Sequence, residues 1–512
     1  MQPTKHSPTL KSFPCSRSLL KLKSCTKASQ LKQAHAALLT HGHGHLPAAA
    51  AAALLSSYVS LSLLDSALLL LRALPDPSSF LRNSLLRSLS AHSHFRASLR
   101  LYSSLLSPRS PPDHFTFPFA LRSAAALSDP RLGRPIHAHS ILYACADDDL
   151  YVNAALVDMY SKCGHVDTAR RVFDRMRQRD LVSWTSMISG YAHNGYAAEA
   201  LDLFRLMRRS GVEPGRVGLL SALLACAHLG ALRKGTCFHG FTVRAGFVRD
   251  VKVVTAVVDM YGRCGSLELA RAVFDCTEGK DVVCWGAMVA CYGYHGLGEE
   301  AIGVFERMVE DGVKPNHATF TSLLSSCSHS GLLREGKEYF DSMKLTYGIE
   351  PNHNHYACVV DILGRAGKLK EAHDIIKRMP MEPHCSIYGS LLGACRIHGD
   401  IDLGERIADK LFELNPHHSG YYVLLSNIYA AKSRWSDVAR VRELMVGRMV
   451  NKVQGFSLIE FDNRIHKFGM EDRCHPESEE VYSYLQQLTS EMKQLGYVPQ
   501  AEFALRDVEN EN

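Results

Sequence analysis

The chain has 512 residues, of which 46% are hydrophobic and 21% charged, and its formal net charge is +6. This length exceeds one compact core and the composition is that of an ordered protein, so a disordered chain and a single small domain are excluded. No run of about 18 uncharged apolar residues suggests a membrane span. The slight excess of basic side chains permits a nucleic-acid partner without demanding one.

The N-terminal stretch is basic and free of acids. The first 64 residues contain no Asp or Glu, but they contain six Lys, one Arg and many Ser and Thr. Such a composition is typical of an organelle transit peptide, and the alternative is a short tail that lacks acids by chance. Repeat-like sequence begins near Cys15, so we assign residues 1–14 to the tail or transit peptide. We favour the mitochondrion as the destination, with the chloroplast as the alternative.

The middle of the chain carries a long internal repeat. The motif Asp158–Gly164 returns 101 residues later as Asp259–Gly265. Three further landmarks share this offset: Trp184 and Trp285, Gly211–Pro214 and Gly312–Pro315, and Cys226 and Cys327. A period of this size is too long for one supersecondary unit and divides into units of 35, 35 and 31 residues, each with a helix–turn–helix pattern. The matched cysteines indicate small packing positions rather than disulfides.

One unit shows why the repeats must stack. In Val251–Asp281, apolar residues recur at helical spacing from Val253 to Tyr261, glycines follow, and a second apolar stripe begins at Leu267. Neither helix can bury its stripe alone, so neighbouring pairs must cover one another. We therefore predict an all-α, right-handed superhelical solenoid in which eleven units tile residues 15–384.

The pattern changes after residue 384. Residues 385–452 resemble two further helix pairs. Residues 456–461 alternate like a strand and turn back through residues 465–468, which predicts a β-hairpin. Glu477–Leu495 is predicted to be a final amphipathic helix, and residues 510–512 a tail.

These motifs resemble a known family. Val182-Ser183-Trp184, the two Asp-Met-Tyr motifs and Gly312–Asn316 are similar to the plant pentatricopeptide repeat family, in its PLS subfamily with repeats of three lengths (P, L and S). Residues 391–399 and 424–429 resemble its E-type motifs, within 385–452. His475–Ser478 and Gly496–Pro499 resemble the extended E (E+) motif, within 453–509, and no DYW deaminase domain follows. The resemblance covers about residues 15–509.

The resemblance implies a function and its partners. It implies a monomeric protein that binds single-stranded organellar RNA and acts as a specificity factor for cytidine-to-uridine editing. A DYW-type deaminase acting in trans and other organellar editing factors would bind through the E region, and no cofactor or membrane is implied. One alternative is an organellar RNA binder for splicing, stability or translation. Another is a tetratricopeptide-like protein-binding scaffold, against which the alternating unit lengths argue, because its period is a uniform 34 residues.

The family also implies which residues read RNA. There, the fifth and last residues of each repeat contact one base. Five units supply the predicted contacts: Asn83 with Asp113 (uracil-preferring), Thr255 with Asp281 (guanine-preferring), Thr321 with Asn352 (adenine-preferring, in a repeat class that follows the rules poorly), Gly286 with Asn316 (no clear rule), and Thr185 (purine-leaning, in a unit that closes with Gly215). One base per repeat places the guanine about seven and a pyrimidine about twelve nucleotides before the edited cytidine. The alternative is that these residues are solvated surface positions and helix N-caps.

One motif superficially suggests catalysis. His475-Pro476-Glu477 has the H-x-E spacing of zinc-dependent cytidine deaminases, which also need a later P-C-x-x-C. No two cysteines of the chain are three apart and none follows Cys474, so two metal ligands are missing. We interpret the motif as a helix start with Glu477 in the first turn, favoured by the helix dipole. No catalytic residue, metal site or enzyme activity is therefore expected.

Overall fold

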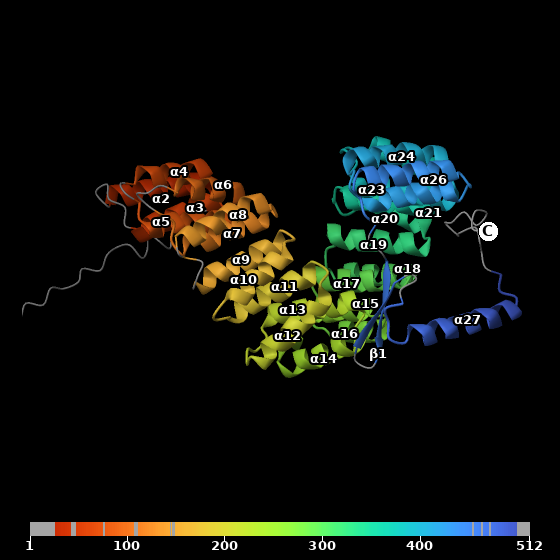
Figure 1. Cartoon of the computed structure of the whole chain (residues 1–512). Helices are drawn as coiled ribbons and strands as arrows, with labels where there is room; N and C mark the ends of the chain where they lie inside the picture. The colour runs from red at the N-terminus through yellow and green to blue at the C-terminus, as the bar shows by residue number, and fades with distance from the viewer. Residues whose placement is uncertain are drawn as a thin grey trace, which may run out of the picture. The chain divides into compact units, whose positions relative to one another are not determined.

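The computed structural model describes residues 26–41, 48–74, 77–106, 111–143, 145, 149–452, 455–461, 464–469 and 473–498. The predicted transit peptide and the C-terminal tail lie outside these ranges. The chain divides into two compact units, residues 1–222 and 223–512. Both consist of stacked helix pairs, and a two-stranded sheet with a final helix follows, so the predicted fold class is confirmed (Figure 1).

In the first unit each helix pair has a short turn. After α2 (Ala28–His41), the pairs are α3 (Ala48–Ser60) and α4 (Leu64–Ala73), α5 (Ser79–Ala91) and α6 (Phe95–Ser104), α7 (Thr116–Ala126) and α8 (Pro130–Leu142), α9 (Leu150–Lys162) and α10 (Val166–Arg175), and α11 (Leu181–His193) and α12 (Ala197–Arg209). The first helix of each pair packs on the first helix of the next, in the order α3, α5, α7, α9 and α11.

The same arrangement continues through the second unit. Its elements are α13 (Arg216–Leu229, which begins in the first unit), α14 (Leu232–Arg244), η1 (Phe247–Arg249), α15 (Val251–Arg263), α16 (Leu267–Asp275), α17 (Val282–Tyr294), α18 (Gly298–Glu310), α19 (His317–Ser330), α20 (Leu333–Leu345), α21 (His353–Arg365), α22 (Leu369–Arg378), α23 (Cys385–His398), α24 (Ile401–Leu414), α25 (Ser419–Ala430) and α26 (Trp435–Gly447). From α15 onward the first helices α15, α17, α19, α21, α23 and α25 again form one packed series.

The repeated landmarks of the sequence occupy equivalent structural places. Trp184 packs edge-to-face on Phe173 with ring centroids 5.0 Å apart, and Trp285 packs in the same way on Phe274, also at 5.0 Å. Both contacts join a second helix to the first helix of the following pair. Gly164 has a φ of +76°, the left-handed conformation that closes the first helix without the steric cost of a Cβ atom.

The matched cysteines are packing residues, as predicted. Cys226 and Cys327 are buried, Cys163 and Cys264 are half-buried, and all four are free thiols. Burial raises the pKa of Cys264 to about 11 and that of Cys327 to about 12, so both remain protonated at neutral pH. These thiols therefore behave as small hydrophobic side chains.

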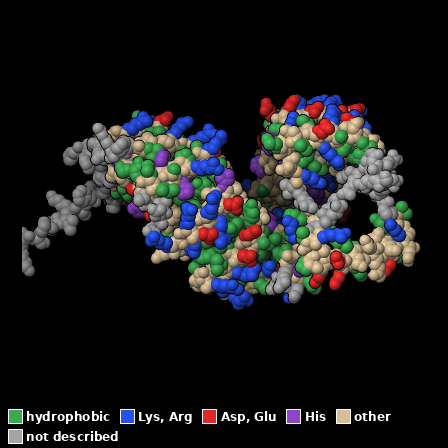
Figure 2. All heavy atoms as spheres, viewed as in Figure 1, with side chains coloured by type: hydrophobic (Ala, Val, Ile, Leu, Met, Phe, Trp, Pro, Cys, Tyr) green, Lys and Arg blue, Asp and Glu red, His purple; other side chains and the backbone are tan. Residues whose placement is uncertain are grey.

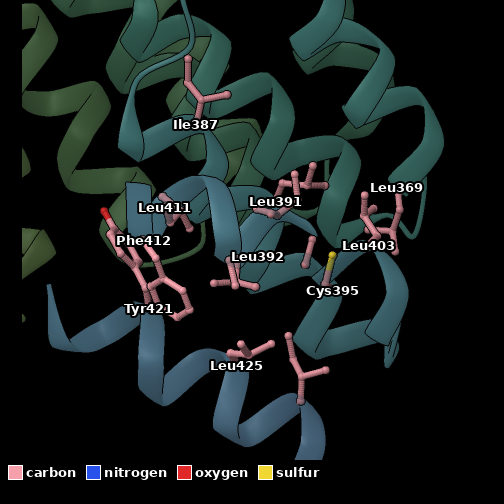
Figure 3. Close-up of a cluster of buried hydrophobic side chains, with 14 of the residues drawn as sticks. Leu369, Ile387, Leu391, Leu392, Cys395, Leu403, Leu411, Phe412, Tyr421 and Leu425 are labelled. Atoms are coloured by element: carbon pink, nitrogen blue, oxygen red, sulfur yellow. The ribbon is translucent and has the colours of Figure 1, made fainter. Parts of the chain in front are cut away.

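The last three helix pairs share one apolar core. Side chains from α21 to α26 form a buried cluster that includes Leu391, Leu392, Leu411 and Leu425, which face one another in Figure 3. Because every pair contributes to this cluster, removal of the last two pairs would expose the apolar face of α21 and α22.

The C-terminal elements differ from the repeats. Strands β1 (Phe456–Phe461) and β2 (Arg464–Gly469) pair antiparallel, with Phe456 opposite Gly469. The Glu460 Oε2 atom accepts a hydrogen bond of 2.9 Å from the backbone N–H of Arg233 in the first turn of α14. Helix α27 (Ser478–Gln494) starts one residue later than predicted, so Glu477 is its N-cap residue rather than part of the first turn, and the acidic residues of that turn are Glu479 and Glu480.

Within the described ranges, the helices are too short or too polar to cross a lipid bilayer.

Candidate nucleic-acid interface

The Asp and Asn residues that close repeats cap the helices that follow. The side-chain oxygen of Asp281 accepts bonds from the N–H groups of Val283 and Cys284, which are otherwise unpaired at a helix start. Seven more acidic or amide side chains make equivalent bonds at the first turn of a first or second helix: Asp129, Asp149, Asp180, Asp250, Asn316, Asn352 and Asp400. The capping interpretation of these residues is thus confirmed, and a cap leaves part of each carboxylate or amide available to a ligand.

The predicted uracil-reading pair is joined directly. Asn83, the fifth residue of its unit, donates from Nδ2 to Asp113 at 2.9 Å (Oδ1) and 3.2 Å (Oδ2). Its Oδ1 atom accepts a 2.8 Å hydrogen bond from the hydroxyl of Thr116. Asp113 Oδ1 also accepts from the N–H groups of Phe115 and Thr116 at the start of α7. The side chain of Asn83 is only 8% exposed, so what it offers a ligand is one amide edge beside the carboxylate.

The predicted guanine-reading pair has a different environment. The Thr255 hydroxyl is buried and has no oxygen or nitrogen partner within hydrogen-bond geometry. Its neighbour is the Cys284 thiol. Burial raises the pKa of this thiol, and the interaction with the Thr255 hydroxyl only partly opposes that increase. Asp281 is engaged in its cap and half-buried. This set therefore has a hydroxyl without a strong partner, whereas in the first set both the nitrogen and the oxygen of the Asn83 amide are hydrogen-bonded.

The other predicted contacts are less complete. The hydroxyl of Thr185 donates to the carbonyls of Leu181 and Val182 in its own helix, and the side chain is 8% exposed. The Thr321 hydroxyl likewise donates to the carbonyl of His317, while Asn352 caps α21. Hydroxyl bonds to a preceding carbonyl use the donor within the helix.

Gly286 is half-buried in α17 and carries no side chain to read a base. Its partner Asn316 is exposed and forms a capping box with Thr319 at the start of α19. Gly215 leaves the Thr185 unit without a polar closing side chain. These two units thus offer at most one polar side chain each.

Sequence reasoning missed a second periodic feature. The second residue of six units is a large apolar side chain between 52% and 71% exposed: Phe80, Phe115, Tyr151, Val182, Val217 and Val283. Each follows a repeat-closing residue by two positions, next to the helix cap. The sequence signal for this feature was an apolar residue on the polar side of the first helical turn. A helix that packs through one face requires no apolar residue on the opposite side. Exposed apolar side chains in such a series are surfaces on which bases can stack.

The H-x-E motif is occupied by internal contacts. His475 Nε2 lies 2.7 Å from His466 Nδ1, and His475 Nδ1 accepts a 3.2 Å hydrogen bond from the N–H of Glu477. Both ring nitrogens therefore bond within the C-terminal segment. Across the described part of the chain, no group of three or more His, Cys, Asp or Glu side chains could hold a metal ion.

Charge is distributed rather than concentrated. On the face drawn in Figure 2, Lys and Arg side chains alternate with Asp and Glu side chains over both units. The Asp of the repeated Asp-Met-Tyr motif pairs with a basic residue one turn later, as in Asp158–Lys162 (2.8 Å) and Asp259–Arg263 (2.9 Å). Such exposed pairs contribute little to stability, on the order of 0.5 kcal/mol or less.

Comparison with protein families identifies the repeats and the region after them. The pentatricopeptide repeat model matches residues 155–181, 182–212, 318–345 and 355–382, a related repeat-family model matches 280–329, and the E motif model matches 398–460. The crystal structure of the pentatricopeptide repeat protein PPR10 from maize aligns at 16% identity over 85% of this chain and 74% of that chain, with a TM-score of 0.44.

Relatives from Arabidopsis thaliana match most of the chain. A pentatricopeptide repeat-containing protein is 40% identical over 430 residues, 84% of this chain and 52% of the relative. The chloroplastic protein CRR2 is 38% identical over 435 residues, 84% of this chain and 66% of CRR2. A mitochondrial member is 37% identical over 515 residues, 98% of this chain and 77% of the relative. The chain thus spans between about half and three quarters of these relatives, and it belongs to the pentatricopeptide repeat protein family, with an E motif after its repeats.

Proposed function

We propose that this protein binds single-stranded RNA in a sequence-specific manner and acts as a specificity factor for cytidine-to-uridine editing in an organelle. The observation that carries RNA binding is the junction between neighbouring units, where a fifth residue meets a closing residue, most clearly in the Asn83–Asp113 pair. A solenoid that places one such junction per repeat can read one unstacked base with each.

The exposed apolar residues support the same mode of binding. Phe115 is two residues from Asp113, so an exposed aromatic ring that can stack on a base lies beside that proposed reading pair, and Val283, two residues from Asp281, offers an exposed aliphatic surface beside the other. Stacking contributes about 1–3 kcal/mol per base and tolerates any sequence, whereas the amide and carboxylate select the base.

The E motif supports our proposal of an editing role rather than RNA binding alone. The motif model covers residues 398–460, immediately after the repeats. We expect this region to recruit a deaminase supplied by another protein, because the ring nitrogens of His475 are engaged and the described residues hold no group of side chains that could bind the zinc ion of such an enzyme. Relatives named chloroplastic and mitochondrial support an organellar location.

Selection from a randomised RNA pool tests RNA binding. Purified protein is incubated with single-stranded oligonucleotides, and the bound fraction is sequenced. We expect enrichment of a uridine about five nucleotides before a guanosine, because five units separate Asn83 from Thr255 and each repeat reads one base. Double-stranded RNA of the same composition is the control. Equal retention of both forms, or no enriched bases, would contradict the proposal.

Transcriptome sequencing of a loss-of-function line tests editing. One or a few organellar cytidines that stay unedited, each preceded by the selected motif, are expected. Normal editing with a defect in splicing, transcript stability or translation would leave RNA binding standing and assign the alternative role.

A further inference from the structure

The junctions between units contain a third residue that neither the family resemblance nor the base-reading pairs include. At several junctions the third residue of a unit lies beside the fifth residue of the unit before it. A Cβ atom at Gly286 would lie 3.8 Å from Thr319 Oγ1, one at Gly218 would lie 3.3 Å from Thr185 Cγ2, and one at Gly389 would lie 3.8 Å from Tyr421. The third residue is therefore a regular neighbour of the position that faces the ligand.

At Asn83 this neighbour makes a directional bond. Asp113 Oδ1 already accepts from Asn83 Nδ2 and from two backbone N–H groups, so its lone pairs are used. The Thr116 hydroxyl lies 2.9 Å from Asp113 Oδ1 and 2.8 Å from Asn83 Oδ1. Its single hydrogen is best given to Asn83 Oδ1, because Asp113 Oδ1 already has three donors. Asp113 can only accept, which fixes Nδ2 toward the carboxylate and Oδ1 toward Thr116.

The bonds leave a defined set of free groups. One N–H of the Asn83 amide and the second oxygen of Asp113, which accepts only the 3.2 Å bond, remain for a ligand. Without the hydroxyl, Asn83 Oδ1 would be a buried acceptor with no donor in a side chain that is 8% exposed. Such an atom is costly to leave unpaired, so the amide would rotate toward water and abandon this orientation.

We propose that Thr116 is a positioning residue for RNA reading: its hydroxyl holds the Asn83 amide in the orientation that distinguishes uridine from cytidine. This inference rests on the proposed RNA binding. Uracil and cytosine differ in the donor and acceptor order of the edge they present, so a fixed amide can separate them and a rotating one cannot. The chemistry requires a hydroxyl at this position rather than a particular shape.

The test uses the full chain and two RNAs that carry the selected motif. The two RNAs differ only in having uridine or cytidine at the nucleotide opposite Asn83. Thr116→Val keeps the β-branched shape but removes the hydroxyl, and we expect the ratio of the two dissociation constants to fall about tenfold, equivalent to about 1.4 kcal/mol. Thr116→Ser restores the hydroxyl and is expected to keep the wild-type ratio.

A matched control separates positioning from capping. Thr319 and Asn316 make the same reciprocal backbone-to-side-chain bonds as Thr116 and Asp113, and in both pairs the threonine hydroxyl also lies within hydrogen-bond distance of the capping oxygen. The fifth residue before Thr319 is Gly286, which has no side chain to orient. Thr319→Val should therefore leave the uridine-to-cytidine ratio at the Asn83 nucleotide unchanged.

Each outcome has a distinct meaning. A wild-type protein that does not prefer single-stranded RNA would refute the proposed function. Discrimination that survives in Thr116→Val, or that falls equally in Thr319→Val, would overturn the positioning role alone. RNA binding without any preference between uridine and cytidine would overturn both the uracil assignment and the role of Thr116.

Discussion

We predict that two substitutions convert the proposed guanine-reading set into the proposed uracil-reading set. Thr255, Cys284 and Asp281 occupy the same places as Asn83, Thr116 and Asp113, and the closing aspartate is common to both sets. Thr255→Asn introduces the amide, which can donate to Asp281. Its Oδ1 atom would still lack a good donor, because a thiol is a weak one. Cys284→Thr supplies the missing hydroxyl.

The structure sets the expected size of each step. Thr255→Asn alone should move the preferred base from guanosine toward uridine. The second substitution adds one neutral hydrogen bond, worth about 1 kcal/mol. It should raise the ratio of uridine to guanosine affinity by a further factor of about five. Cys284→Thr alone leaves Thr255 in place and should keep the preference for guanosine.

Fluorescence anisotropy with short single-stranded RNAs measures these ratios. The RNAs differ only at the nucleotide opposite Thr255, and the salt concentration is fixed because phosphate contacts make affinity strongly salt-dependent. The reasoning is refuted if the single and double variants have the same ratio, since the third residue would then contribute nothing. Unchanged preference for guanosine in both variants would remove the base assignment of Thr255 itself.

Three further predictions concern packing, pH and the C-terminal region. Gly262→Ala should destabilise the protein by about 1–3 kcal/mol in denaturant unfolding, because a Cβ atom at this position would clash with Cys291. Gly303 has open space around it, so Gly303→Ala should stabilise the protein by up to about 1 kcal/mol. Burial lowers the pKa of His355, so at acidic pH the folded state binds fewer protons than the unfolded state. The melting temperature should therefore fall as the pH drops below about 6.5. This pH dependence should be weaker in the His355→Asn variant. Deletion of residues 453–512 spares the buried cluster of Figure 3. The deletion should leave the RNA affinity measured by anisotropy unchanged but abolish editing in a complementation assay. An edited transcript would refute the role of this segment.

The sequence predicted the helix pairs because their signals are local. Apolar spacing and the glycines after the first helix depend on neighbours in the chain. The 101-residue offset shows that these local patterns recur, and the structure places Trp184 and Trp285 in equivalent contacts. The start of α27 was predicted one residue too early because His475 bonds the N–H of Glu477 and keeps it in the cap. The contact between Glu460 and Arg233 joins residues 227 positions apart, and no local pattern could predict it.

The base-reading residues show where sequence reasoning stops. Capping and reading were opposed as alternatives for Asp113, yet they do not exclude one another, because Oδ1 accepts from the start of α7 while Oδ2 accepts only the 3.2 Å bond from Asn83. The chemistry of Asn83 then depends on Thr116, which lies 33 residues away and in the next unit. A code that assigns a base from two side chains treats the environment of the pair as constant. In this chain that environment varies from a hydroxyl to a thiol, so equal pairs in different units are expected to discriminate to different degrees.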